Sequence, residues 1–166
     1  MSHIKIFLGI FVVFSVSRFI PHPPNFTSVI ALSFYIPAIL GLRFIPAVVI
    51  CFALTDYFIG LHNTIFYTWI SILIIGLISI YFLNTKIKRF LGVLFSCIIF
   101  YLITNYGVWL EGSIYEPNFK GLIECYILAI PFFYYSMFST IMYAIIIEVI
   151  TYLFNKKSVF INYLKK

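Results

Sequence analysis

The chain has 166 residues, of which 63% are apolar, 21% are aromatic and only 10% are charged, and its mean hydropathy is +1.09. A soluble domain contains about 25% charged and roughly 45–50% apolar residues, so this composition cannot provide a water-facing surface. We therefore predict an all-α integral membrane protein that forms a single transmembrane domain over residues 1–166. A nucleotide-binding domain of roughly 100–200 residues does not fit beside the membrane helices.

Six apolar segments follow one another along the chain, and most approach the length of about 20 residues that a membrane helix requires. They cover residues 4–19, 26–42, 44–60, 64–83, 90–110 and 121–154. No small-residue cleavage site follows the first segment, so we expect it to remain as a helix and not to be removed as a signal peptide. The pattern predicts a six-transmembrane-helix bundle.

The last apolar segment is too long for one straight crossing. At about 1.5 Å per residue it would extend about 50 Å, whereas the hydrocarbon core is about 30 Å thick. Pro131 is the expected break because it removes a backbone hydrogen bond and clashes with the preceding turn. We predict a short extra helix over 121–130, followed by the last span over 132–154.

The basic residues predict the orientation in the membrane. The formal net charge of +6 would suggest nucleic acid in a soluble protein, but here the basic residues flank apolar segments as topology signals do, and no nucleic-acid partner is expected. With both termini cytoplasmic, the outer side holds Arg18 and Lys120. The inner side collects the other basic residues: Lys5, Arg43, Lys86, Lys88, Arg89, Lys156, Lys157, Lys165 and Lys166.

Unusual polar residues gather in the three predicted outer connections. His22 lies between prolines, either in a rigid hairpin or at a ligand. Asp56 lies about one turn inside the end of its span, where an ionisable side chain needs a partner; Arg18 or His62 could form a salt bridge with it, or it could contact a ligand.

In the third connection Asn105 lies one helical turn from Trp109 on the same face, although Trp109 also fits an aromatic belt at the membrane surface.

Other polar and small residues have structural explanations as well. Cys51, Cys97 and Cys125 are predicted to be free, buried thiols. Glu148, inside the last span, is expected to reach water or a partner's basic residue. Two stripes of small residues would allow close helix packing, either within the chain or against a partner subunit. They are Gly121, Cys125 and Ala129, and Ser136, Thr140 and Ala144.

The sequence contains no recognisable catalytic or metal-binding motif. The histidines are dispersed, no serine lies in a nucleophile motif and no glycine-rich phosphate loop is present. We therefore expect neither an enzyme nor a bound cofactor or metal.

Several strings together resemble the signature of a family of uncharacterised bacterial membrane proteins. That family is in turn similar to the substrate-binding S components of energy-coupling-factor (ECF) vitamin transporters. The strings are Arg-Phe-Ile-Pro-His-Pro-Pro-Asn-Phe-Thr at 18–27, Asp56 with Gly60 and His62-Asn63, Thr-Asn-Tyr-Gly-Val-Trp at 104–109, Gly121-Leu122 with Cys125-Tyr126, and Ala-Ile-Pro-Phe-Phe at 129–133. The family usually continues with an Asn-Thr and a Gly-Asp pair, whereas this chain has Tyr135, Ser136, Ser139 and Thr140.

The resemblance implies an S-component-like fold of six helices in the bacterial cytoplasmic (inner) membrane. It also implies uptake of a small organic solute, a vitamin or precursor, with an energising membrane subunit and ATPases supplied in trans. We predict a ligand pocket near the outer face, in which aromatic rings stack on the ligand and polar groups orient it. Its predicted residues are His22, Asn25, Asp56, His62, Asn105, Trp109 and Tyr126.

Two other functions are compatible with the sequence. The small-residue stripes and the basic inner ends would suit a non-catalytic scaffold or assembly subunit of a membrane complex. An intramembrane enzyme would instead use His22 or His62 with Asp56 as a general base pair.

Overall fold

The computed structural model describes the backbone of residues 3–164 and the side chains of residues 4, 5 and 7–154. This part of the chain is helical and contains no strand. The elements are α1 (His3–Phe19), α2 (Val29–Leu40), η1 (Leu42–Phe44), α3 (Ile45–Ile59), α4 (Ile65–Ile78), η2 (Ser79–Phe82), α5 (Lys86–Glu111), α6 (Phe119–Leu128) and α7 (Ile130–Leu164).

Four helical segments in the described residues are long and apolar enough to cross a membrane. They are Leu42–Ile59, Ile65–Phe82, Lys86–Glu111 and Ile130–Phe154. Two further apolar helices, Phe7–Phe19 and Val29–Leu40, are shorter. The prediction of an all-helical, multi-pass membrane protein is therefore confirmed.

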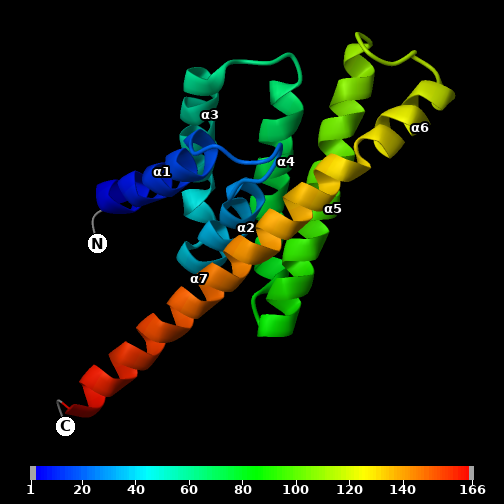
Figure 1. Cartoon of the computed structure of the whole chain (residues 1–166). Helices are drawn as coiled ribbons and strands as arrows, with labels where there is room; N and C mark the ends of the chain where they lie inside the picture. Colours follow the sequence, from blue (N-terminus) through cyan, green and yellow to red (C-terminus); the bar gives the residue numbers. More distant parts are fainter. Residues whose placement is uncertain (1–2, 165–166) are drawn as a thin grey trace.

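Helices α3, α4 and α5 run side by side, and α7 passes obliquely across them (Figure 1). Helix α1 is steeply inclined to α3 and packs against it (Figure 1). The α3–α4 and α5–α6 connections lie at the same end of the bundle, the upper end in Figure 1. This arrangement brings polar residues from distant parts of the sequence to one end of the molecule.

Helix α2 is the central helix of the bundle. Nine consecutive residues, from Val29 to Pro37, are buried, because α2 packs against α3, α4, α5 and α7. A helix that is apolar on all sides requires such an environment. On one side Leu32 contributes to a core with Phe14 of α1. On the other, Phe34 contributes to a core with Val93 of α5, so α2 joins both halves.

The predicted break before the last span is confirmed, two residues earlier than expected. Helix α6 ends at Leu128, Ala129 forms its C-cap and α7 begins at Ile130. Pro131 is therefore the second residue of α7. At this position a backbone N–H would have no hydrogen-bond partner within the helix, so proline is tolerated. At the other end the helix continues to Leu164, beyond the predicted end at residue 154.

The two small-residue stripes pack within the chain. All six residues are buried: Gly121, Cys125 and Ala129, and Ser136, Thr140 and Ala144. The tightest approach is at Gly121, where an added Cβ would lie 2.2 Å from the backbone oxygen of Glu116. Of the two explanations that the sequence left open, internal packing accounts for these residues. The prediction of free, buried cysteines is also confirmed.

Glu148 has a basic partner inside the chain, which the sequence did not predict, and its side chain is 24% exposed. Its carboxylate accepts from Arg89 Nε at 2.5 Å and from Arg89 Nη2 at 2.9 Å. The Tyr35 hydroxyl donates to the same carboxylate at 3.1 Å. This cluster joins α2, α5 and α7 at the end of α5 where Lys86 lies. The side chains of Lys156, Lys157, Lys165 and Lys166 lie outside the described residues.

Candidate functional site

A cavity of about 580 Å³ is lined by residues of the α1–α2, α3–α4 and α5–α6 connections and of every α-helix. Its volume is within the range of roughly 300–1,000 Å³ that is typical of small-molecule sites. Apolar and aromatic side chains, among them Phe52, Phe100, Tyr101 and Phe133, form most of the wall. The residues that line it include one arginine and two histidines but no aspartate or glutamate.

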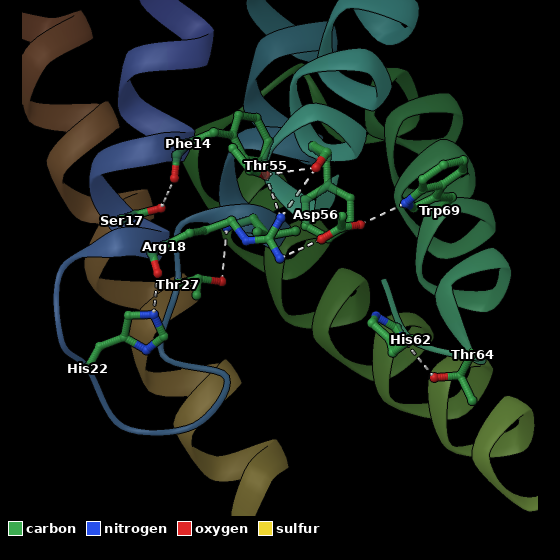
Figure 2. Close-up of polar contacts among 12 residues, drawn as sticks. Phe14, Ser17, Arg18, His22, Thr27, Thr55, Asp56, His62, Thr64 and Trp69 are labelled. Carbon is green, nitrogen blue, oxygen red and sulfur yellow. Dashed lines mark hydrogen bonds and ion pairs between the residues drawn. The ribbon is translucent and has the colours of Figure 1, made fainter. Parts of the chain in front are cut away.

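Arg18 lies in the last turn of α1 and provides the positive charge of the cavity wall. Its Nη1 donates to Thr55 Oγ1 at 2.5 Å and to the Phe52 carbonyl oxygen at 3.3 Å. Its Nη2 donates to Asp56 Oδ1 at 2.5 Å (Figure 2). The guanidinium carbon lies 4.3 Å from the centre of the Phe52 ring, and the side chain is 13% exposed. Helix α3 therefore fixes the guanidinium in one orientation.

Asp56 lies behind Arg18 and is not among the residues that line the cavity. It is 1% exposed, and both carboxylate oxygens accept hydrogen bonds: Oδ1 from Arg18 and Oδ2 from Trp69 Nε1 at 2.8 Å (Figure 2). A buried carboxylate requires such partners. Of the two salt-bridge partners that the sequence left open, Arg18 is the one found. Asp56 thus holds Arg18 in place and contacts no cavity space itself.

His22 and Asn25 line the cavity from the proline-rich α1–α2 connection. The two ring nitrogens of His22 face carbonyl oxygens: Nδ1 lies 2.8 Å from that of Pro23 and Nε2 lies 3.3 Å from that of Arg18. Asn25 has a φ of 60°, a left-handed conformation that asparagine tolerates better than most residues. The connection is therefore a defined structure, with His22 held against the end of α1.

His62 and Asn105 line the cavity from the α3–α4 connection and from α5. His62 Nδ1 lies 3.0 Å from Thr64 Oγ1 (Figure 2). The Asn105 amide nitrogen donates to the Tyr101 carbonyl oxygen one turn earlier, at 2.8 Å. That bond leaves the amide oxygen of Asn105 as an acceptor for a ligand.

Trp109 and Tyr126 are not among the lining residues, although the sequence placed them in the pocket. Trp109 Nε1 donates to the backbone oxygen of Glu116 at 3.1 Å. The Tyr126 hydroxyl donates to the Leu102 carbonyl oxygen at 2.7 Å, while the Tyr101 hydroxyl donates to the Tyr126 carbonyl oxygen at 2.5 Å. These bonds hold the α5–α6 corner together, so both side chains support the cavity from outside. Four of the seven predicted residues line it: His22, Asn25, His62 and Asn105.

A family model described as a family of unknown function (DUF6580) matches residues 1–161. The chain belongs to this family. No curated protein and no solved structure matches it. Membership of DUF6580 assigns no activity, so the chemistry of the cavity is the basis for any function.

Three notable residues that line the cavity of this DUF6580 chain were not predicted to do so: Arg18, Tyr101 and Tyr115. Arg18 was counted among the outer topology charges. Its position in the last turn of an apolar helix could have indicated a buried, functional charge. The two tyrosines are hidden among many aromatic residues. Partial burial, with smaller contributions from Cys125 and Glu124, raises the pKa of Tyr115. Its phenol therefore stays protonated and can donate to a ligand.

The His–Asp base pair that an intramembrane enzyme would use is not formed in this structure. Neither His22 nor His62 is hydrogen-bonded to Asp56, because Arg18 and Trp69 occupy that carboxylate. Among the described residues, no three His, Cys, Asp or Glu side chains are grouped so as to hold a metal ion. The arrangement is one of hydrogen-bond donors and acceptors on an apolar wall, which suits reversible binding of a small molecule.

Proposed function

We propose that this chain is a substrate-binding membrane subunit for the uptake of a small organic solute, such as a vitamin or a precursor. The observation that carries the proposal is the cavity of about 580 Å³, which is lined by residues of all seven α-helices that the structure describes and of three connections. A wall of aromatic and aliphatic side chains with a few oriented polar groups is the usual composition of a ligand site. The resemblance to ECF S components gives the same function.

The proposed topology has six crossings and both termini in the cytoplasm. It adds α1 and α2 to the four long segments. Helix α2 has 12 residues and so extends about 18 Å, which is less than the hydrocarbon thickness of about 30 Å. Its burial among neighbouring helices makes this acceptable, since non-helical backbone at membrane depth is tolerated where protein surrounds it. Loop charges then place the cavity near the outer face of the cytoplasmic membrane.

Transport would require partners. The chain offers no domain for ATP hydrolysis, so we assign energy input to a separate membrane subunit with ATPases in trans. In this scheme the cavity captures the solute from the outer side and the partner drives its release inward.

Ligand-induced stabilisation of the purified protein in lipid nanodiscs tests the proposal. A ligand at about 100 times its Kd raises the free energy of unfolding by about 2.7 kcal/mol, which a thermal shift detects readily. We expect stabilisation by at least one member of a panel of vitamins and precursors. Its absence across the panel up to millimolar concentration would contradict the proposal.

A pair of variants distinguishes the cavity from nonspecific binding. Val108 lines the cavity, whereas Leu102 on the same helix is 49% exposed and does not line it. Val108→Trp should fill cavity space and abolish the ligand-induced shift. Leu102→Trp should leave the shift unchanged. Equal shifts in both variants would place the binding site elsewhere.

The structure gives the two alternative functions less support than the sequence did. A scaffold subunit was suggested by the small-residue stripes, but these are buried against other helices of the same chain. An intramembrane enzyme was suggested by a His–Asp pair, but the Asp56 oxygens are bonded to Arg18 and Trp69. Crosslinking that recovers stable partners without any transporter ATPase would restore the scaffold hypothesis.

A further inference from the structure

We propose that the solute bound in this cavity carries a carboxylate, and that Arg18 binds it with the part of its guanidinium group that the protein leaves free. This inference rests on the proposed function and specifies the class of solute: a planar, largely apolar organic acid. Three features of the site support it: the unused hydrogen-bond donors of Arg18, the charges around the cavity and the apolar wall.

The hydrogen bonds of Arg18 leave donors unused. A guanidinium group has five N–H donors in a planar fork. Nη1 donates to Thr55 and to the Phe52 carbonyl oxygen, and Nη2 donates to Asp56. Within the described residues Nε has no acceptor, and it is not among the fully buried atoms that lack a partner. The Nε–H group and one Nη2–H group point in the same direction, which is the geometry that binds a carboxylate through two parallel hydrogen bonds.

The charges around the cavity favour an anion over a cation. The lining residues contain Arg18, His22 and His62 and no acidic side chain. Asp56 lies on the α3 side of the guanidinium, away from the cavity lining. An oxyanion at the unused N–H groups of Arg18 would therefore meet no acidic lining residue, whereas a cationic group there would find no carboxylate to pair with.

Asp56 does not remove the need for an anion at this place. Its carboxylate offsets the charge of Arg18 and holds the side chain in a buried position, where an unpaired guanidinium would be strongly destabilising. The remaining N–H groups are still partial positive charges in a poorly solvated wall. A charge-assisted hydrogen bond to them is roughly twice as strong as a neutral one. Asp56 therefore orients the group that we expect to bind the ligand.

The apolar wall indicates what the rest of the solute is like. Tyr101 and Phe133 stand with ring centres 4.9 Å apart and both line the cavity. Phe100 and Ile30 extend the same apolar surface. Aromatic surfaces of this kind suit a flat, weakly polar body. Together with Arg18 they favour an aromatic acid over a polyol or a sugar.

Matched carboxylate and carboxamide probes test the inference directly. Suitable pairs are benzoate with benzamide, 2-naphthoate with 2-naphthamide, and indole-3-acetate with indole-3-acetamide. Trp69 is hydrogen-bonded to Asp56 and so reports on the site, and Trp109→Phe removes the other tryptophan. Binding is measured in phosphatidylcholine nanodiscs. For the naphthoate and benzoate pairs the readout is quenching or a spectral shift of Trp69 fluorescence, and for all three probe pairs the thermal shift is measured as well. We expect the carboxylates to bind at least about tenfold more tightly than their amides.

Two double variants show whether Arg18 is responsible. Arg18→Met with Asp56→Asn removes both charges of the site and leaves Trp69 an acceptor, so the preference for carboxylates should disappear. Arg89→Met with Glu148→Gln removes the matching ion pair at the other end of α5, outside the cavity lining. This control should keep the preference. If the control loses it as well, the effect is one of general stability and the assignment to Arg18 is wrong.

The remaining outcomes separate this inference from the proposed function. Equal or tighter binding of the amides would overturn the inference and leave the proposed function standing. No binding by any carboxylate or amide, together with no shift in the vitamin panel, would contradict both. Stabilisation that depends on Arg18 and appears only when phosphatidylglycerol is added would mean that the site binds a lipid headgroup. That result would overturn the assignment to a soluble organic acid.

Discussion

Arg18 on α1 and Asp56 on α3 lie 38 residues apart in the sequence, and their side chains meet with Nη2 and Oδ1 at 2.5 Å. Trp69 of α4 donates to the other Asp56 oxygen. One buried carboxylate thus links three helices at the cavity wall. Because α1 packs mainly against α3, this pair also fixes the inclined orientation of α1.

We predict that Asp56→Ala strongly destabilises the protein. Removal of one partner leaves Arg18 buried without its counter-charge and Trp69 without its acceptor, and breaking a buried pair in this way decreases stability by about 3–5 kcal/mol. The measurement is SDS-induced unfolding followed by circular dichroism. Glu124→Ala is the control, because Glu124 is exposed and should change stability by less than about 0.5 kcal/mol. Similar values for the two variants would show that the buried pair is not structurally important.

The α5–α6 corner gives a second prediction. Tyr101 and Tyr126 each donate a hydroxyl hydrogen to a backbone carbonyl oxygen of the other helix. Tyr126→Phe should lower the free energy of unfolding by about 0.5–1.5 kcal/mol, since it removes one such bond and little apolar contact. Tyr134→Phe is the control, because Tyr134 is 60% exposed. An unchanged unfolding midpoint for Tyr126→Phe would mean that the bond contributes nothing to the corner.

The sequence predicts most of the fold because lipid leaves few alternatives. Apolar length gave the helices, and Pro131 gave the break before the last one, since a proline is well placed only in the first turn of a helix. The contacts of buried charges were harder to predict. Glu148 was expected to reach water or a partner, but Arg89 comes close enough only because α5 and α7 pack together. Such proximity depends on tertiary packing that no local pattern encodes.

The cavity residues in the connections were easier to predict from the sequence than those on the helices. His22 and Asn25 stand out because prolines fix the loop around them. Tyr101 does not, because in this chain aromatic residues are also the common filler of apolar helices. Asp56 was expected as a binding residue, but it is 1% exposed and hydrogen-bonded to Arg18 and Trp69. Sequence can identify an ionisable residue in a membrane helix, but which member of a pair faces the cavity depends on the packing.

Two glycine variants should have opposite effects. Gly121→Ala places a Cβ 2.2 Å from the backbone oxygen of Glu116, which cannot move without opening the α5–α6 connection. We expect destabilisation of about 1–3 kcal/mol. Gly9→Ala meets nothing within 4 Å and gains helix propensity, so it should be neutral or stabilising by up to about 1 kcal/mol. Unfolding in SDS measures both, and a stabilising Gly121→Ala would contradict the close packing.

The proposed orientation predicts which connections face the outside of the cell. In a background with all three cysteines changed to serine, Ser113→Cys in the α5–α6 connection should react with an impermeant maleimide on intact cells. Asn84→Cys, just before α5, should react only after permeabilisation. The reason is the concentration of Lys86, Lys88 and Arg89 beside Asn84, which favours the cytoplasmic side. The reverse labelling pattern would place the cavity on the cytoplasmic side.

Cys125 provides a native probe of access to the cavity. It lines the cavity, whereas Cys51 belongs to the core between α1 and α3 and does not. N-ethylmaleimide should therefore label Cys125 faster than Cys51 in single-cysteine variants, and Val108→Trp should slow the labelling of Cys125.

Burial raises the pKa of the Cys125 thiol, and the thiolate is the form that reacts. The labelling rate should therefore still increase from about pH 9 to about pH 10, where an ordinary thiol with a pKa of about 8.5 approaches its plateau. A plateau reached below about pH 9, or equal rates for Cys51 and Cys125, would show that Cys125 does not lie in a reagent-accessible part of the cavity wall with a raised thiol pKa.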